Sequence, residues 1–423
     1  MWSRNTRRRV ISLLNNVLRK PALANCISSL EFSSDNSLDW LHEEHIPISI
    51  PVDGFNLSLA VQTISGSGLP FIQQWIQQLF GGEGDAFLAL LLLKLHGLKH
   101  LVISTRYFTS EVLSLFLRAA LCVPGTCGPA AFQNLSEVTY KIRGRYRRLA
   151  TQYRCVCGQG AADTLPFFCL SSITRLSISL DNPESLDWPI LSTSNPSMLT
   201  SLDLHLVRES HLLGLLSMTP KLKYLKWTLF FCDTRRRKHP IQPTNTLLVE
   251  LDKVSAALEQ VRDTLQDLEI AVEVQHIESY LEAPNLRLNG TLRSLTTLPR
   301  LTVLKIPPEF LFASLSIESA LPLKLVVPNH IETLVLTDDL ADQEFDEWDG
   351  WALYDSISDW LQDGAATNSA LRDIQFTLVG DPENPFYMDW PLDARQQLGY
   401  LAHEYGVKAE VLFGSSGYYG KDI

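Results

Sequence analysis

The side chains that could hold a metal ion are few and widely spaced. Cys122 and Cys127 are separated by four residues, and Cys155 and Cys157 by one, so together they could supply four thiolates to zinc. Neither spacing is the two-residue gap common in zinc sites, and no histidine pair lies nearby in the sequence. The pattern therefore favours ordinary loop cysteines, and a zinc site stays the alternative.

Two further stretches have side chains or glycines that could bind ions. An acidic run could bind a divalent cation, but it lacks the calcium-loop spacing with glycine at the sixth position, so we interpret it as a solvated loop. Its members are Asp338, Asp339, Asp342, Glu344, Asp346, Glu347 and Asp349. Gly81-Gly82-x-Gly84 precedes an expected helix and could hold a phosphate. It lacks the Lys-Ser/Thr pair of a P-loop, and no strand is expected before it.

No arrangement of residues typical of catalysis is visible in the sequence. Neither Gly-x-Ser-x-Gly nor His-Glu-x-x-His occurs, and no histidine stands beside a plausible nucleophile. We therefore predict a protein that is not an enzyme and that uses no cofactor or metal. Two basic stretches, Arg143–Arg148 and Arg235–Lys238, could contact an acidic partner, and the second could be a nuclear-import signal. Short basic runs also occur by chance in exposed loops, and we favour that interpretation for both stretches.

Composition limits the class of partner. The 423 residues have a formal net charge of −11, which argues against nucleic acid and anionic membrane as partners. No apolar run approaches the roughly 20 residues of a membrane span. Seven cysteines in a chain of this length fit a reducing compartment, so we expect the cytoplasm or the nucleus. The basic N-terminus could be a mitochondrial presequence, or a helix with Ile11, Leu14 and Leu18 on one side.

A repeated apolar pattern organises the chain. Leu199, Leu202 and Leu204 form an apolar-x-x-apolar-x-apolar motif that recurs 23 residues later as Leu222, Leu225 and Trp227. The residues between the two copies predict a helix and a turn at Pro220. Ten copies are recognisable, and their fourth positions are Leu30, Leu101, Val138, Leu176, Leu202, Leu225, Leu268, Leu304, Leu334 and Ile374. A repeat of this kind predicts a leucine-rich-repeat solenoid.

The repeat is irregular, with steps from 23 to 43 residues beyond Leu101, so we expect uneven curvature. The predicted class is α/β: one curved parallel sheet with helices on the convex side. The clearest helical pattern is Leu247, Leu251, Val254, Leu258, Val261 and Leu265, which predicts a helix over 247–265. Val407, Ala409, Val411 and Phe413 predict a final strand after a helix that ends near Gly406.

The residue between the last two apolar positions of each motif should point away from the core. These residues are Val102, Thr139, Ser177, Asp203, Lys226, Glu269, Lys305, Val335 and Gln375. Mixed charges with polar and small groups are typical of a protein-facing surface more than of a small-molecule pocket. We therefore predict that Asp203, Lys226, Glu269, Lys305 and Gln375 face a protein partner.

Several motifs bear a family resemblance. Leu298-Pro299-x-Leu301-x-x-Leu304-x-Ile306 resembles the irregular leucine-rich repeats of F-box proteins, and so does Pro220-x-Leu222-x-x-Leu225-x-Trp227. The helix before Pro21 and the closing helix-Gly406-strand are similar too. The likeness is to filamentous-fungal F-box or leucine-rich-repeat proteins, and it covers nearly the whole chain. No F-box is recognisable upstream of the repeats, so residues 1–25 are interpreted as a linker helix and residues 26–423 as the repeat arc.

The resemblance implies a specific role. It implies the target-binding part of a substrate receptor in an SCF-type ubiquitin ligase, with a Skp1-type adaptor as partner if an F-box exists upstream. The first alternative is a repeat-only scaffold or regulator without a ligase role. The second is a metal-binding protein or hydrolase that uses the cysteine loops.

Overall fold

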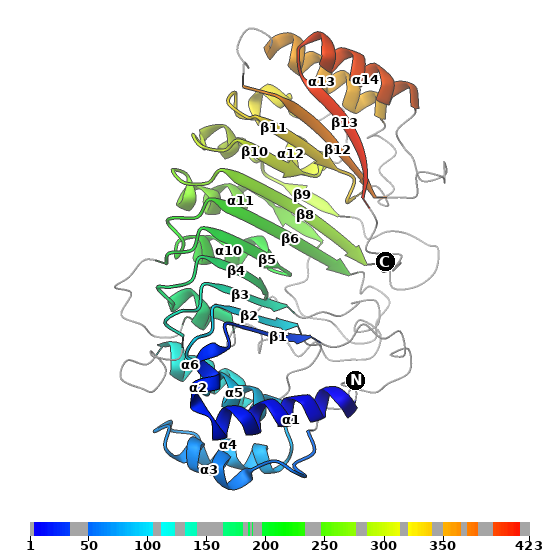
Figure 1. The fold of residues 1–423 in the computed structure, drawn as a ribbon. Coiled ribbons are helices and arrows are strands. Elements are labelled where there is room, and N and C mark those ends of the chain that lie inside the picture. The colour runs from blue at the N-terminus through cyan, green and yellow to red at the C-terminus, as the bar shows by residue number, and fades with distance from the viewer. Residues whose placement is uncertain are drawn as a thin grey trace, which may run out of the picture. The chain divides into compact units, whose positions relative to one another are not determined.

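The computed structural model of the chain divides into two compact units. Figure 1 shows its helices and strands. Unit 1 comprises Met1–Arg145 and Val156–Leu199, and unit 2 comprises Tyr146–Cys155 and Thr200–Ile423. The structure describes residues 4–33, 50–104, 111–122, 132–141, 164–180, 185–186, 188, 197–232, 247–275, 286–313, 320–340, 350–364, 370–379 and 392–414. Among these residues, no helix combines the length and the apolar character needed to cross a membrane.

Unit 1 contains short parallel strands and the helices that cover them. Its elements are α1 (Arg4–Arg19), α2 (Pro21–Cys26), β1 (Ser29–Ser33), α3 (Leu57–Ser65), α4 (Ile72–Phe80), α5 (Gly84–Lys94), β2 (His100–Ser104), α6 (Glu111–Cys122), β3 (Glu137–Lys141), η2 (Leu165–Cys169) and β4 (Arg175–Ser179). The strands pair in the order β1-β2-β3-β4. Leu101 lies between Leu30 and Val138, and Val138 pairs with Leu176, so the predicted motif positions align across the strands.

The N-terminal helix α1 is part of the core of unit 1. Ile11, Leu14 and Leu18 are buried, as the helical pattern predicts. Asn15 joins the helix to the following loop, because its amide donates to Gly54 O at 2.9 Å and its carbonyl oxygen accepts from Asn56 N at 3.0 Å. These contacts favour the interpretation of this segment as a structural helix face.

Unit 2 repeats the same plan with more strands. Its elements are β5 (Ser201–His205), α10 (Glu209–Leu216), β6 (Tyr224–Cys232), β7 (Leu248–Glu250), α11 (Leu251–Leu258), η3 (Glu259–Val261), β8 (Asp267–Gln275), β9 (Arg287–Asn289), η4 (Arg293–Thr297), β10 (Val303–Ile306), α12 (Pro308–Phe312), η6 (Leu323–Leu325), β11 (Thr333–Thr337), α13 (Gly350–Gly364), β12 (Asp373–Val379), α14 (Leu392–Glu404) and β13 (Lys408–Gly414). The main strands pair in parallel in the order β5-β6-β8-β10-β11-β12-β13. Both units thus confirm the predicted α/β class, with parallel strands flanked by helices.

The core of unit 2 follows from the two-residue alternation of its strands. Leu202, Leu225, Leu268 and Leu304 are paired in register from β5 to β10, and each is at most 3% exposed. Alternate residues of a strand point to opposite faces, so this register gathers the leucines on one side of the sheet. The helices between the strands bury that side.

The helix predicted over 247–265 is partly wrong. Residues Leu248–Glu250 form strand β7, which pairs in parallel with β9 in a separate two-stranded sheet. The helix α11 begins only at Leu251, and the stripe Leu251, Val254 and Leu258 is buried as expected. Leu247 and Leu248 match the helical period, but backbone pairing with Arg287–Asn289 takes precedence over that local preference.

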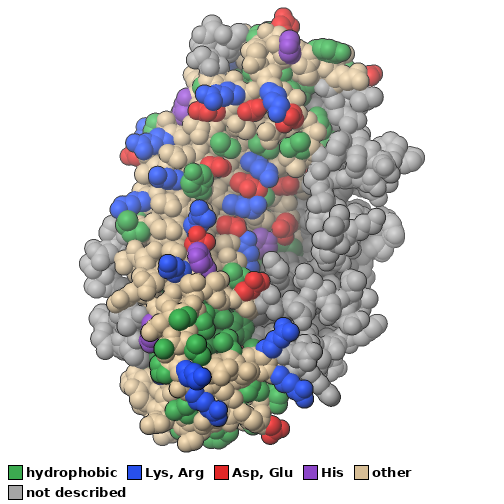
Figure 2. Space-filling model, in the orientation of Figure 1, with side chains coloured by type: hydrophobic (Ala, Val, Ile, Leu, Met, Phe, Trp, Pro, Cys, Tyr) green, Lys and Arg blue, Asp and Glu red, His purple; other side chains and the backbone are tan. Residues whose placement is uncertain are grey.

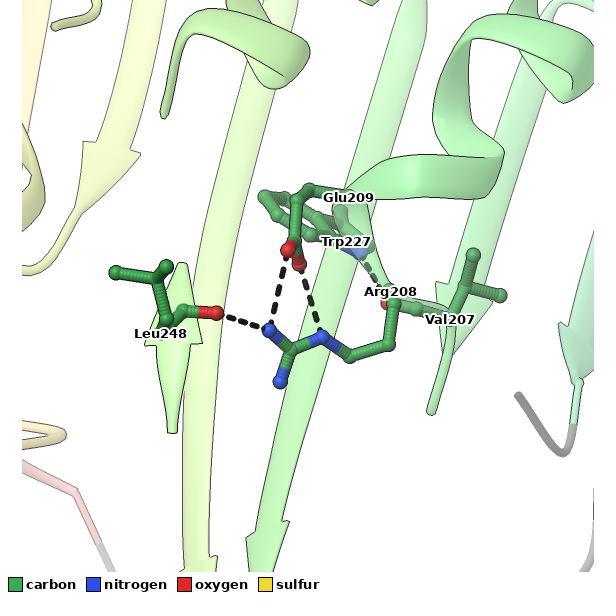
Figure 3. Close-up of polar contacts among 5 residues, drawn as sticks. All are labelled: Val207, Arg208, Glu209, Trp227 and Leu248. Carbon is green, nitrogen blue, oxygen red and sulfur yellow. Dashed lines mark hydrogen bonds and ion pairs between the residues drawn. The ribbon is translucent and has the colours of Figure 1, made fainter. Parts of the chain in front are cut away.

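A buried ion pair fixes the turn from β5 into α10 (Figure 3). The Arg208 guanidinium donates to both carboxylate oxygens of Glu209, at 2.9 and 3.1 Å, and to the carbonyl oxygen of Leu248 in β7. It also lies 5.1 Å from the ring centroid of Phe231. Both charged side chains are about 5% exposed, and Trp227 Nε1 donates to Val207 O at 2.8 Å beside them. The pair therefore joins strands β6 and β7 to helix α10 in a buried site through charge-assisted hydrogen bonds and the contact with Phe231.

Replacing Glu209 with alanine should destabilise the protein strongly, because it leaves the Arg208 guanidinium buried without its counter-charge. The expected loss in the free energy of unfolding is about 3–5 kcal/mol, measured by urea denaturation. The exposed pair of Arg372 and Glu332, 3.9 Å apart, is the control, and Arg372→Ala should cost much less. A double variant, Arg208→Met with Glu209→Leu, should recover most of the loss. A Glu209→Ala variant as stable as the control would contradict this account.

Candidate functional site

Five predicted partner-facing residues lie in one row across unit 2. Asp203 pairs with Lys226, Lys226 with Glu269, and Glu269 with Lys305. Lys305 is followed by Val335 and then Gln375 at the same register position. Their strand positions alternate with the buried leucines, so the side chains lie on the opposite face of the sheet. We call Asp203, Lys226, Glu269, Lys305 and Gln375 the charged row. The structure places the first four on adjacent strands, whereas Val335, which is only 7% exposed although it was predicted to point away from the core, separates Gln375 from them. The partner itself stays a prediction.

Glu269 is the centre of this row. Its Oε1 atom lies 2.9 Å from Lys226 Nζ and 3.1 Å from Lys305 Nζ, so one carboxylate serves two ammonium groups on neighbouring strands. The three side chains are partly exposed, at 44% for Lys226, 22% for Glu269 and 33% for Lys305. The row is therefore accessible to solvent, and its side chains are held in place before any partner arrives.

The electrostatics of the row reflect both burial and pairing. Burial would raise the pKa of Glu269, but the hydrogen bond and charge of Lys226, and then Lys305, outweigh it and lower that pKa. Burial would likewise lower the pKa of Lys226, yet Glu269, with Asp203 and Asp339 nearby, raises it above its ordinary value. Both groups therefore stay charged over the physiological pH range.

Two aspartates lie near the row: Asp267, which was not predicted as a site residue, and Asp339, which was predicted only as part of a solvated acidic loop. Burial and the charge of Glu269 raise the pKa of Asp267, and Lys305 opposes that rise. Asp339 follows β11, and its Oδ2 accepts a hydrogen bond of 2.8 Å from Val272 N of β8. Burial raises the pKa of Asp339 against the stabilising effect of that hydrogen bond. The position of Asp267 could have been predicted from the sequence, because it is an acid at the first residue of a strand. The hydrogen bond between Asp339 and β8 depends on tertiary structure and could not.

The face that contains the charged row is mixed in sign (Figure 2). Acidic and basic side chains alternate over the middle strands of unit 2, with few hydrophobic side chains among them. Tyr224, 48% exposed, is an aromatic exception and lies beside Asp267 in the register of β6 and β8. This arrangement suits contact with charged and polar groups of another macromolecule more than enclosure of a small apolar ligand.

Glu309 is a buried carboxyl group close to this face. It lies in α12 and is 6% exposed, and its Oε2 has no hydrogen-bond partner among the described residues. Burial raises the pKa of Glu309 to about 7, and the neighbouring charges of Asp339 and Asp338 act in the same direction. Its sequence signal is a single acid within the apolar run Pro307–Phe312, which we did not single out.

The structure does not support a metal or phosphate site at the other sequence candidates that it describes. No three His, Cys, Asp or Glu side chains of the described ranges are grouped so that they could hold a metal ion. The turn Gly81–Gly84 leads into α5, whose first turn holds the buried acid Asp85, an unfavourable neighbour for phosphate. Cys127, Cys155, Cys157, Arg143–Arg148, Arg235–Lys238 and residues 341–349 of the acidic run lie outside the described residues.

Cys122 has a partner that sequence reasoning missed. Its thiol interacts directly with that of Cys169 at the end of η2, and both are free cysteines. The two residues are 47 positions apart, and neither spacing nor local pattern relates them. Their proximity follows from the packing of α6 on η2. Cys122 therefore belongs to a pair that the four-thiolate hypothesis did not contain.

Neutralising Glu309 should make the stability of the protein less dependent on pH. An acid whose pKa is higher in the folded than in the unfolded state destabilises the fold as pH rises from about 4.5 to about 7. The Glu309→Gln variant lacks this effect, so its advantage over the parent should grow across that window, to about 2–3 kcal/mol at pH 8. Urea denaturation at pH 5 and pH 8 measures it, and a difference independent of pH would contradict the assignment.

Comparison with protein families and with curated proteins adds nothing on this site. No protein-family model matches the sequence. No curated protein matches it either. Its function has to be inferred from its own side chains and their geometry.

Proposed function

We propose that the chain is a non-catalytic recognition protein that binds a protein partner through the charged row of unit 2. The observation that supports this most is the register: five polar side chains from five strands form one row on the face opposite the leucine core. Side chains on rigid, paired strands lose little freedom on binding, which favours specific recognition. Mixed charge fixes orientation and excludes mismatched partners.

The proposed architecture is an irregular leucine-rich-repeat arc. It would have a curved parallel sheet, the charged row on its inner side and helices on its convex side. The alternation of buried and partly exposed positions in strands such as β5 and β10 supports it, as do the helices or 3-10 turns between successive strands. Steps of unequal length between strands would give uneven curvature.

A more specific version of the proposal is the target-binding part of an SCF-type ubiquitin ligase receptor in the cytoplasm or the nucleus. Its support is the resemblance of the motifs around Pro220 and Pro299, whose strands β6 and β10 begin where the motif predicts. Co-purification with a Skp1-type adaptor from the native host would support this version. A full-length gene product without bound adaptor favours a scaffold or regulator built on the same recognition face.

Site-specific crosslinking tests the recognition face directly. A photo-reactive amino acid at Tyr224 or at Gln375 should form the same partner adduct in cells of the native host, because Gln375 belongs to the charged row and Tyr224 lies beside it on the same face. The control positions are Leu213 on α10, 46% exposed, and Tyr400 on α14, 77% exposed, which should not form that adduct.

Charge reversal makes the test specific to the row. Asp203→Lys combined with Glu269→Lys should abolish the adduct from Tyr224, because the attractions of Glu269 to Lys226 and Lys305 become repulsions and the charged side chains of the row all become basic. An adduct formed from Leu213 or Tyr400 but not from the row would overturn the proposal, and so would one that persists after charge reversal.

A further inference from the structure

We propose that the segment of the partner that contacts the charged row is basic and presents arginine or lysine side chains to the carboxylates around Glu269. This inference rests on the proposed function and adds the chemistry of the partner. The row and its nearest neighbours contain four carboxylates, Asp203, Asp267, Glu269 and Asp339, against the two ammonium groups of Lys226 and Lys305.

The surplus of carboxylates over ammonium groups affects the charge states of the side chains in and beside the row. Lys226 is partly buried, which by itself disfavours its charged form, but three surrounding carboxylates stabilise the ammonium group. Asp267 and Asp339 each have Glu269 as a neighbour of like charge. A further cation placed over this group would therefore be attracted, whereas a carboxylate would be repelled.

Tyr224 and Asp267 make arginine a good fit. They are directly paired residues of β6 and β8, so their side chains leave the same face of the sheet about 5 Å apart. Tyr224 is exposed, and a guanidinium group can stack on its ring while it donates to a neighbouring carboxylate. The geometry therefore favours a planar cation at this end of the row.

Peptide selection against the intact chain tests the charge of the partner segment. A random peptide library displayed on phage should yield sequences enriched in arginine and lysine, and a synthetic peptide from that pool should bind more weakly as salt rises. Asp267→Asn should weaken its binding by about fivefold, as expected for the loss of one partly exposed charge-assisted contact. Asp263→Asn removes the same charge from the exposed turn after η3 and should leave binding unchanged.

Removing a positive charge from the row should have the opposite effect to removing a negative one. Lys305→Gln makes the face more negative and should strengthen binding of the basic peptide, whereas a role of Lys305 as a direct contact would weaken it. Selection of neutral or acidic peptides that crosslink at Tyr224 would overturn the basic-segment inference and leave the recognition face intact. Failure to select any peptide, together with the absence of a cellular adduct from the row, would overturn both.

A second, independent observation concerns the thiols of unit 1. We infer that Cys122 and Cys169 form a disulfide with each other by exchange with a small-molecule disulfide such as oxidised glutathione. They lie at the ends of α6 and η2, which pack together, and their thiols are in direct contact. Cys122 is 7% exposed and Cys169 is partly exposed, so Cys169 is the accessible member of the pair.

The order of the exchange steps follows from the difference in exposure between the two thiols. The hydrogen bond from Cys122 lowers the pKa of Cys169, while the same contact and burial raise the pKa of Cys122. The Cys169 thiolate attacks one sulfur of glutathione disulfide and releases one glutathione thiolate. Cys122 then loses its proton and attacks Cys169 in the mixed disulfide, which releases a second glutathione. Two protein thiols are oxidised and one glutathione disulfide is reduced to two thiols.

Mass spectrometry of the full chain after incubation with oxidised glutathione tests this inference. The expected product is a peptide pair linked through Cys122 and Cys169. In the Cys122→Ser variant, Cys169 should retain one glutathione, because the second thiol is missing. Cys26 is exposed and serves as the control, and Cys26→Ser should leave the linked product unchanged. Linkage of either cysteine to another residue, or two unmodified thiols beside a glutathionylated Cys26, would overturn the inference.

Discussion

The structure of unit 2 depends on the in-register pairing of its parallel strands. When neighbours align residue for residue, every second position of each strand is placed on the same face, and a slip by one residue would exchange the two faces. If β8 slipped by one residue against β6, Glu269 would lie on the same face as Leu225, and Lys226 on the same face as Leu268. Burying either leucine would then also bury a charged side chain. The cost of burying those charges is what specifies the register, so the apolar core and the charged row have one physical origin.

The chain places its charges in two very different environments. Arg208 and Glu209 are almost fully buried, and their contacts link the turn after β5 with α10, β6 and β7. Glu269 and its two lysines are partly exposed and join three strands without filling a core. The first group specifies one packing arrangement of the backbone, and the second leaves a surface whose charges are already oriented for another molecule.

Sequence reasoning predicted the strands well because their signal is local. The motif around Leu304 predicts that Leu304 is buried and that Lys305 points away from the core, and the structure agrees. It failed where distant segments decide the outcome. The strand β7 exists because Arg287–Asn289 pairs with it, and the contact of Cys122 with Cys169 depends on how α6 packs on η2. The contacts that a long side chain makes across strands, such as one carboxylate shared by two lysines, likewise cannot be predicted from the apolar periodicity.

The unequal connections between strands have a consequence for how such a surface can diversify. The steps from Leu202 to Leu225 and from Leu225 to Leu268 are 23 and 43 residues, yet Asp203, Lys226 and Glu269 keep the same alignment. The length of a connection between two strands therefore does not determine how their residues align in the sheet. Insertions or deletions in the connections could accumulate without displacing any side chain of the row, while a single substitution within a strand would alter its specificity directly.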